Sequence, residues 1–138
     1  MILGYVFKEI EAKRSEIDNK VDINSTIDII DVKEIEIDIG EKKKVVEIEF
    51  EFKVEYKPTD SKIVLKGNVL YSSNNNKEIV KNWEKHKRLP EDVDIKVKNF
   101  LLRKCLTFSI IISEEIRMPS PLPFPVIVKR QEEKSYIG

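Results

Sequence analysis

Residues 45–56 have the sequence VVEIEFEFKVEY, which is the clearest structural signal in the chain. From Val46 to Tyr56 every second side chain is apolar, and the side chains between them are all charged. A period of two is that of a β-strand with one buried face and one wet face. At about 3.3 Å per residue such a strand extends over about 35–40 Å, which predicts a large sheet or a strand that reaches into another subunit.

The strand over residues 45–56 has a partner immediately after it. Residues 58–61 have the turn sequence PTDS, and alternation resumes over residues 63–71. The two segments therefore predict a long antiparallel hairpin. Gly40 and the three charged residues after it predict a second turn, before the first strand of the hairpin.

Two further segments are β-like but irregular. Residues 5–12 alternate loosely, with Tyr5 and Phe7 on one expected face. Within residues 23–39 the parity of the apolar positions changes twice, which a bulge or short bend near residues 29–35 would explain. This second segment is either one bent strand or two short ones. The remaining apolar positions are Val6, Ile10 and Ala12 on the opposite face of the first segment, and Ile27, Ile29, Ile30, Val32, Ile35, Ile37 and Ile39 in the second.

The pattern changes from strand to helix after Ser72. Residues 73–76 offer helix caps, and a short helix is expected over residues 78–87. The sequence LPED at residues 89–92 ends that helix and opens a longer one, expected to reach Ile116 over about 39 Å. The residues of the longer helix expected to pack on the sheet are Val93, Val97, Phe100, Leu101, Cys105, Phe108, Ile111, Ile112 and Ile116.

The longer helix is apolar nearly all round between residues 100 and 112. Leu102, Leu106 and Ile110 lie on what would be its outer side. One sheet cannot cover both sides of a helix, so either the rest of the chain wraps this surface or another copy packs on it. We expect the second arrangement, a homo-oligomer of two or four subunits with these three residues in its interface.

Alternate prolines end the longer helix. Residues 118–125 have the sequence MPSPLPFP, which forces an extended backbone and predicts an ordered crossing loop. A backbone fixed by proline can present Met118, Leu122 and Phe124 to an unfolded chain at low ordering cost. Residues 129–138 form a polar tail that is expected to fray. We therefore expect a single α+β domain over residues 1–128, followed by this tail.

Composition excludes several classes of function. The 138 residues match the size of one domain, and 25 basic side chains balance 25 acidic ones, so the formal net charge is zero. No global field favours nucleic acid or an anionic membrane, and neither is expected as a partner. Cys105 has no second cysteine to pair with, no secretory leader opens the chain, and residues 100–112 are too short an apolar stretch for a membrane span. A cytoplasmic location is expected.

No residue pattern in the chain is typical of catalysis or cofactor binding. The four glycines are isolated, so there is no glycine-rich phosphate loop. His86 lies between two lysines without an orienting partner, and Cys105 lies in an apolar helix, where an inert buried thiol is expected. One histidine and one cysteine do not make a zinc site. We expect no enzymatic activity, no cofactor and no metal.

Two charged rows have simple explanations as solvated surfaces. Glu47, Glu49 and Glu51 could bind a cation, but the wet face of a half-buried strand has the same pattern. The basic residues within 81–88 could contact nucleic acid, but Trp83 is the only aromatic residue among them, and carboxylates surround them. We interpret both rows as solvated faces.

The order of these elements resembles that of the SecB-type export chaperones. Residues 99–106, NFLLRKCL, look like the main helix of that family, and residues 118–125 look like its proline-rich crossover. The hairpin over residues 45–71 and the opening strand also fit. The resemblance implies an α+β fold in which a long helix packs on one face of a four-stranded antiparallel sheet, and a tetramer formed as a dimer of dimers. It also implies ATP-independent binding of unfolded or partly folded polypeptides in apolar grooves beside the crossover.

The resemblance and the apolar pattern together predict three groups of functional residues. The group expected to bind polypeptides is Phe50, Phe52, Met118, Leu122 and Phe124. The group expected at the oligomer interface is Leu102, Leu106 and Ile110. The acidic group, similar in kind to the surface on which SecB-type chaperones dock their ATPase, is Glu47, Glu49 and Glu51.

The chain departs from the SecB pattern at two places. Because only residues 129–138 follow Val128 in this sequence, we expect the closing helix of the family to be reduced or missing and its zinc-binding tail to be absent, so delivery for export is not expected. The helix over residues 78–87 is an addition. Two alternative functions stay open: a module dedicated to one protein partner, as in a toxin–antitoxin pair, and an enzyme or small-ligand protein that uses the cleft between sheet and helix.

Overall fold

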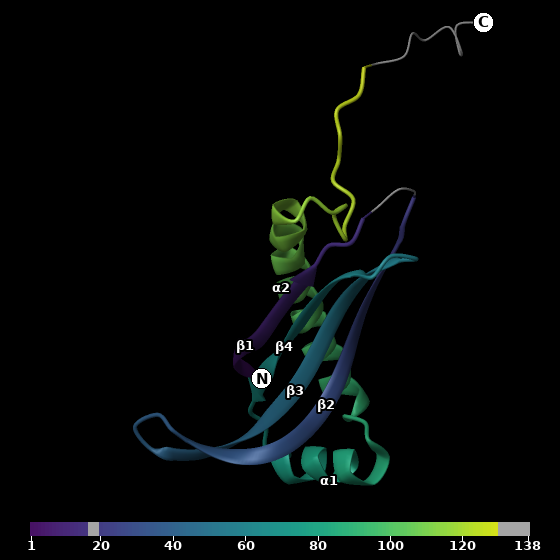
Figure 1. Cartoon of the computed structure of the whole chain (residues 1–138). Coiled ribbons are helices and arrows are strands. Elements are labelled where there is room, and N and C mark those ends of the chain that lie inside the picture. Colours follow the sequence, from purple (N-terminus) through teal and green to yellow (C-terminus); the bar gives the residue numbers. More distant parts are fainter. Residues whose placement is uncertain (17–19, 130–138) are drawn as a thin grey trace, which may run out of the picture.

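A computed structural model describes residues 1–16 and 20–129. The chain forms a four-stranded antiparallel sheet with a long helix across one face and a short helix at one end (Figure 1). The order of the strands in the sheet is β1-β4-β3-β2. This arrangement confirms the predicted fold class. The elements are β1 (Ile2–Lys13), β2 (Asp22–Asp38), β3 (Lys42–Lys57), β4 (Ser61–Tyr71), α1 (Asn76–His86) and α2 (Glu91–Glu115).

The core is built around β3, which pairs with β4 on one side and with β2 on the other. The alternating apolar side chains from Val46 to Tyr56 are each 0% exposed. Pairing with β4 stops at Val46, and beyond it β2 and β3 continue as a two-stranded hairpin to the turn at Gly40 (Figure 1). The predicted strand over residues 45–56 is therefore paired on both sides along almost its whole length, and the hairpin extension adds residues 42–45 to it.

The irregular segment over residues 23–39 is a single bent strand, β2. Its pairing with β3 shifts once, between Ile29 and Asp31, which places Val32 on the face covered by α2. From Asp31 to Asp38 the pairing is regular, so Ile35 and Ile37 lie on the other face. The second change of parity in the sequence therefore marks a change in which face is apolar, and not a second bulge.

A similar shift corrects the prediction for β1. The pairing with β4 is irregular between Phe7 and Glu9, so Ile10 and Ala12 lie on the same face as Tyr5 and Phe7. The expectation that Ile10 and Ala12 lie on the face opposite to Tyr5 and Phe7 is wrong. An extra residue in one strand inverts the parity of everything after it, and simple alternation does not show where that residue is.

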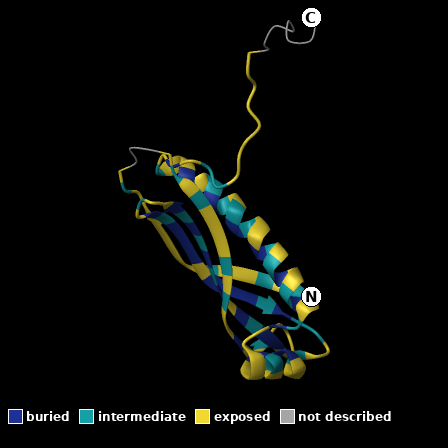
Figure 2. Ribbon diagram, turned by 90° about the vertical axis from the view of Figure 1, so that its right-hand side faces the viewer, coloured by how far each residue is buried: buried dark blue, intermediate teal, exposed yellow. Residues whose placement is uncertain are grey.

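The helix α2 packs on the sheet through every fourth residue. In its C-terminal half the buried row consists of small side chains: Cys105, Ser109 and Ser113. Small residues let the helix backbone approach the strands, and the larger apolar residues Leu106, Phe108 and Ile112 beside this row are only partly buried. Buried and more exposed positions alternate along the helix (Figure 2). The prediction of Ile111 as a core residue is wrong, because its side chain is 55% exposed. Within the described ranges, no helix has the length and apolar composition that a membrane crossing requires.

The short helix α1 begins two residues before the predicted start and covers one end of the core. Ile79 and Trp83 are its buried residues. It ends at Lys87, which has a left-handed backbone (φ 54°) and donates its N–H to the carbonyl oxygen of Trp83 at 2.8 Å. This cap turns the chain toward α2.

The proline-rich segment is attached to the core at its first residues. Met118 is buried, and the hydroxyl of Tyr56 donates to the carbonyl oxygen of Pro119 at 2.8 Å. From Leu122 to Lys129 every residue is exposed, and the backbone extends away from the sheet and α2 (Figures 1 and 2). The prediction of a non-helical backbone is confirmed for residues 119–129, which bend at residues 121 and 122. The predicted crossing loop is not formed within the described residues, because the segment runs away from the sheet and α2 (Figure 1). The predicted tail lies, from residue 130 onward, outside the described residues.

Candidate functional site

An open apolar groove lies between β1 and the C-terminal half of α2. Its volume is about 490 Å³. The strand contributes Tyr5, Phe7 and Ile10, and the helix contributes Phe108 and Ile111. The groove exists because the bulge in β1 returns Ile10 to the helix side, and because the small inward row of α2 leaves its larger side chains at the flank. Arg103, Lys104 and Thr107 complete the lining.

Aromatic rings connect the groove to the core. The ring of Phe7 stacks on that of Phe108, with the centroids 5.3 Å apart, and meets the buried ring of Phe50 edge-on at 6.2 Å. Tyr5 contacts Phe100 edge-on at 5.4 Å. Offset-stacked and edge-to-face pairs at these separations are favourable, so the floor of the groove is firmly packed.

The walls of the groove are exposed to solvent. Tyr5 is 40% exposed, Ile10 54% and Ile111 55%. The ammonium group of Lys104 lies 5.7 Å from the ring centroids of both Tyr5 and Phe100. A contiguous apolar surface with a basic rim is typical of an interaction site, because isolated soluble domains rarely leave such a patch uncovered.

The groove also adjoins an unpaired strand edge. β1 pairs with β4 on one side, and no strand in the described residues pairs with its other side. Its outward N–H and C=O groups can therefore form a ladder with an added extended segment. Apolar side chains and an open edge occur here on the same strand.

The residues predicted to bind polypeptides are not gathered in this groove. Phe50 and Phe52 are 0% exposed beneath α2, and Met118 is 6% exposed. Leu122 and Phe124 are 43% and 54% exposed, on the segment that extends away from the sheet. A ligand can contact these last two directly, but it can reach Phe50 and Phe52 only if α2 moves.

The residues predicted for an oligomer interface lie on the other flank of α2. Leu102 is 36% exposed, and Leu106 and Ile110 are half-buried. Leu106 packs partly against the core, so the surface left for another copy is smaller than the sequence pattern indicates. The interface itself stays a prediction.

The predicted acidic row lies on the face of the sheet that α2 does not cover, and lysines interrupt it. The ammonium group of Lys33 lies 3.5 Å from a carboxylate oxygen of Glu47, and that of Lys53 lies 3.2 Å from one of Glu51. The hydrogen bond and charge of Glu51 raise the pKa of Lys53. Glu49 is exposed between them. Charges of both signs alternate here, as expected for a solvated strand face. Docking of a partner on this row stays a prediction.

Two titratable side chains in the core have pKa values far from their ordinary ones. Cys105 is fully buried, and burial raises the pKa of its thiol to about 12, so it is a poor nucleophile at neutral pH. Burial likewise raises the pKa of Tyr56 to about 12. Among the described residues, no group of three or more potential ligands is placed to hold a metal ion.

The sequence pattern did not identify the groove residues as a site. Phe108 and Ile111 were assigned to the core, and Tyr5, Phe7 and Ile10 were considered only as strand positions. One available signal is the apolar character of residues 5–12 on both expected faces, which is unusual for a strand that has one wet side. That signal shows excess apolar surface, but it does not show which helix lies beside it.

The chain has the SecB-like fold. It matches the structure of the Mycobacterium tuberculosis SecB-like chaperone Rv1957, which was solved in complex with a ChAD peptide from the Rv1956 HigA1 antitoxin. The TM-score is 0.53, the match covers 95% of this chain and 92% of that chain, and 11% of the aligned residues are identical. No family model matches the sequence, and no curated protein matches it in sequence.

Proposed function

We propose that this protein is a non-enzymatic, ATP-independent chaperone that holds unfolded or partly folded polypeptides in the groove between β1 and α2. The observation that carries the proposal is the exposed apolar lining beside an unpaired strand edge. Tyr5, Ile10 and Ile111 offer apolar contact area, and the edge of β1 offers backbone hydrogen bonds that do not depend on the sequence of the client.

Each part of the groove suits a different property of a non-native chain. Unfolded segments expose apolar side chains, whose burial contributes about 25 cal/mol per Å². They also have unpaired backbone groups, which can extend the sheet at β1. The basic rim of Arg103 and Lys104 favours clients that carry acidic residues beside their apolar ones. Release needs no nucleotide, because many weak contacts exchange readily.

The SecB-like fold supports peptide binding as the class of function. The structural neighbour Rv1957 binds a peptide from an antitoxin. We propose the same class of ligand for this chain, an extended polypeptide segment. Leu122 and Phe124 would add contacts from the proline-rich segment, and Phe50 and Phe52 would contribute only through a movement of α2.

A homo-oligomer of two or four subunits is part of the proposal. The flank of α2 with Leu102, Leu106 and Ile110 would provide one interface. The double variant Leu106→Glu with Ile110→Glu is expected to yield a smaller particle in light scattering while the far-ultraviolet circular dichroism of the sheet is retained. A wild-type protein that is monomeric at micromolar concentration would contradict this part of the proposal.

The main test measures aggregation of a chemically denatured model enzyme, citrate synthase, by light scattering. The wild-type protein is expected to suppress aggregation near equimolar ratio without nucleotide. The double variant Tyr5→Ser with Ile111→Ser is expected to lose most of this suppression. Its matched control is Ile39→Ser with Ile95→Ser, which removes two side chains that are 64% and 52% exposed outside the groove. Equal activity of the two double variants would refute the groove as the site.

A second candidate function is a chaperone dedicated to one partner. The antitoxin peptide bound to Rv1957 favours this version, because that ligand comes from one defined protein. A dedicated chaperone would leave denatured citrate synthase to aggregate but would bind a segment of its own partner at the same groove. Failure of both the generic client and every tested antitoxin segment would contradict both versions.

A further inference from the structure

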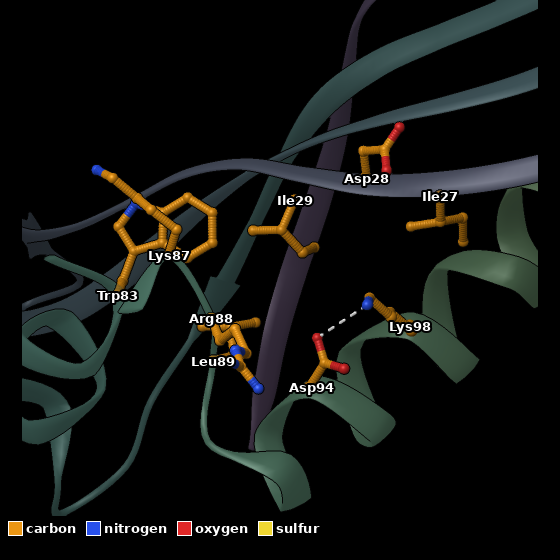
Figure 3. A pocket seen from close by; sticks show the side chains of 9 residues that line it. All are labelled: Ile27, Asp28, Ile29, Trp83, Lys87, Arg88, Leu89, Asp94 and Lys98. Atoms are coloured by element: carbon orange, nitrogen blue, oxygen red, sulfur yellow. Dashed lines mark ion pairs between the residues drawn. The ribbon is translucent and has the colours of Figure 1, made fainter. Parts of the chain in front are cut away.

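A second hollow, separate from the groove, lies where β2, α1 and α2 meet. Its volume is about 270 Å³. Ile27 and Ile29 of β2, Trp83 of α1 and Leu89 of the connection form its apolar side (Figure 3). Trp83 and Leu89 are 6% and 5% exposed, so this side is a firm wall. The hollow is slightly smaller than the about 300–1,000 Å³ of typical small-molecule sites, and it suits one large side chain.

The polar side of this hollow has an excess of positive charge. Arg88, Asp94 and Lys98 lie together on it, and Asp94 is paired with Lys98 at 3.2 Å (Figure 3). Arg88 forms no ion pair within the part of the chain that the structure describes. Asp28 also borders the hollow, but its carboxylate points away from it (Figure 3). One guanidinium group is therefore left to receive an anion.

The backbone at Arg88 is held in place by its neighbours. The preceding residue, Lys87, is the left-handed cap of α1, and the side-chain amide of Asn82 donates to the carbonyl oxygen of Arg88 at 3.1 Å. The ammonium group of Lys87 lies over the Trp83 ring, 5.7 Å from its centroid. The fixed backbone sets the point from which the side chain reaches the hollow, and the planar guanidinium can hold a carboxylate through two parallel hydrogen bonds.

A neighbouring hollow continues the first one on the other side of Arg88, so that the two form one path along the surface. It has a volume of about 510 Å³ and shares Arg88, Leu89 and Asp94 with the first. Its further lining includes Glu91, so carboxylates are present along the whole path. A polyanion such as nucleic acid carries a charge on every residue and would be repelled by these carboxylates along its length, whereas a segment with a single carboxylate can place that group at Arg88. A peptide fits better, because it needs one anchor for an apolar side chain, one for a carboxylate, and room for its backbone to continue.

We propose that the hollow between β2, α1 and α2 is a second peptide-binding site, which takes an acidic segment with a large apolar side chain next to a carboxylate. The apolar side chain lies against Ile29, Trp83 and Leu89, and the carboxylate binds Arg88. The site is separate from the groove at β1, so it does not depend on the proposed holding function. It would let the protein select acidic apolar segments independently of groove binding.

Trp83 makes the test specific, because it is the only tryptophan in the chain. A change in its fluorescence on binding reports this hollow and not the groove. The probe is the tryptophan-free peptide GSFEGSGS, with GSFQGSGS as the uncharged match. The acidic peptide is expected to shift the emission of Trp83 in a saturable way and to bind about tenfold more tightly than the uncharged one.

Charge reversal identifies the anchor. Arg88→Glu is expected to weaken binding of the acidic peptide about tenfold and to remove its preference over the uncharged peptide. The matched control, Arg103→Glu in the groove, is expected to leave the affinity unchanged. Circular dichroism checks that both variants fold. No saturable change of Trp83 emission up to millimolar peptide, or equal effects of the two reversals, would overturn the proposal.

The groove variant separates this proposal from the function proposed above. Tyr5→Ser with Ile111→Ser is expected to bind the acidic peptide at the Trp83 site as the wild type does, even if it no longer suppresses aggregation. Loss of peptide binding in this variant, with binding retained in Arg88→Glu, would place the peptide in the groove and overturn the second site. Retained suppression by Arg88→Glu would leave the holding function standing.

Discussion

β1 and β3 belong to one sheet and both carry many apolar side chains, but only β3 buries them. β3 has a strand on each side and helices over one face, and its inward side chains from Val46 to Tyr56 are 0% exposed. β1 has one neighbouring strand and lies beside the flank of α2, so Tyr5 and Ile10 are 40% and 54% exposed. The apolar side chains of β3 therefore stabilise the fold, whereas those of β1 are available as a binding surface.

The largest expected effect contrasts the two strands directly. Phe50→Ala is expected to lower the free energy of unfolding by about 3–5 kcal/mol, because it removes a fully buried ring and leaves a cavity. Tyr5→Ser is expected to cost less than about 1.5 kcal/mol, since much of its side chain already contacts water. Urea unfolding followed by circular dichroism measures both. Similar losses for the two variants would mean that Tyr5 is a core residue.

The second prediction concerns the contact between β1 and the central strands. A Cβ atom on Gly67 would lie 1.9 Å from the backbone carbonyl oxygen of Val6, a distance that requires β1 to move. Gly67→Ala is therefore expected to cost about 1–3 kcal/mol and to loosen β1. Hydrogen exchange should show faster exchange in residues 2–13 than in β3. Equal protection of both strands would indicate that β1 and β3 unfold as one unit.

The third prediction asks whether α2 stays on the sheet when a client binds. Burial raises the pKa of Cys105 to about 12, so the thiol is protonated and shielded at pH 8. We expect it to react with an aromatic disulfide reagent at the same slow rate with and without a saturating client. Faster reaction with the client would mean that α2 lifts and that Phe50 and Phe52 become accessible.

The raised pKa of the same thiol predicts that the protein becomes less stable as the pH rises into the alkaline range. Below about pH 9 both the folded and the unfolded chain keep the proton. Between about pH 9 and 12 the unfolded chain releases it and the folded chain keeps it, so the free energy of unfolding falls as pH rises. Cys105→Ala should show a shallower decline, measured by urea unfolding at several pH values.

The smallest effect on stability is expected in the proline-rich segment. Leu122→Ser with Phe124→Ser is expected to change the free energy of unfolding by less than about 0.5 kcal/mol, because both side chains are exposed. Client binding should fall more than stability does. Suppression of client aggregation measures the first, and the midpoint of urea unfolding measures the second. An equal loss of both would show that these side chains pack in the core of the assembled protein.

The sequence was sufficient for most of the fold. The hairpin of β3 and β4, the start of α2 after Pro90 and the non-helical backbone after Met118 all follow from local patterns, and all three are present. The acidic row could also be placed on the wet face of β3, because alternation assigns a face to each residue of a regular strand.

The candidate site was less predictable, for two physical reasons. The bulge after Phe7 changes the face of Ile10, and its position depends on pairing with β4. The rotation of α2 depends on which small residues fit against the sheet, and this places Ile111 at the flank. Neither event has a signature in the residues concerned.

The sequence by itself determined the type and order of most elements and the absence of a recognisable catalytic motif, since these follow from short-range periodicity, prolines and residue types. It left open whether residues 23–39 form one strand or two, and it placed several ends a few residues away from where they lie. Only the tertiary structure decided which apolar side chains stay exposed. Exposure depends on strand order, on the edge position of β1 and on the seating of α2 against β4, which are contacts between residues far apart in the chain. The groove arises from those contacts, because the same apolar residue is core beneath a helix and binding surface beside one.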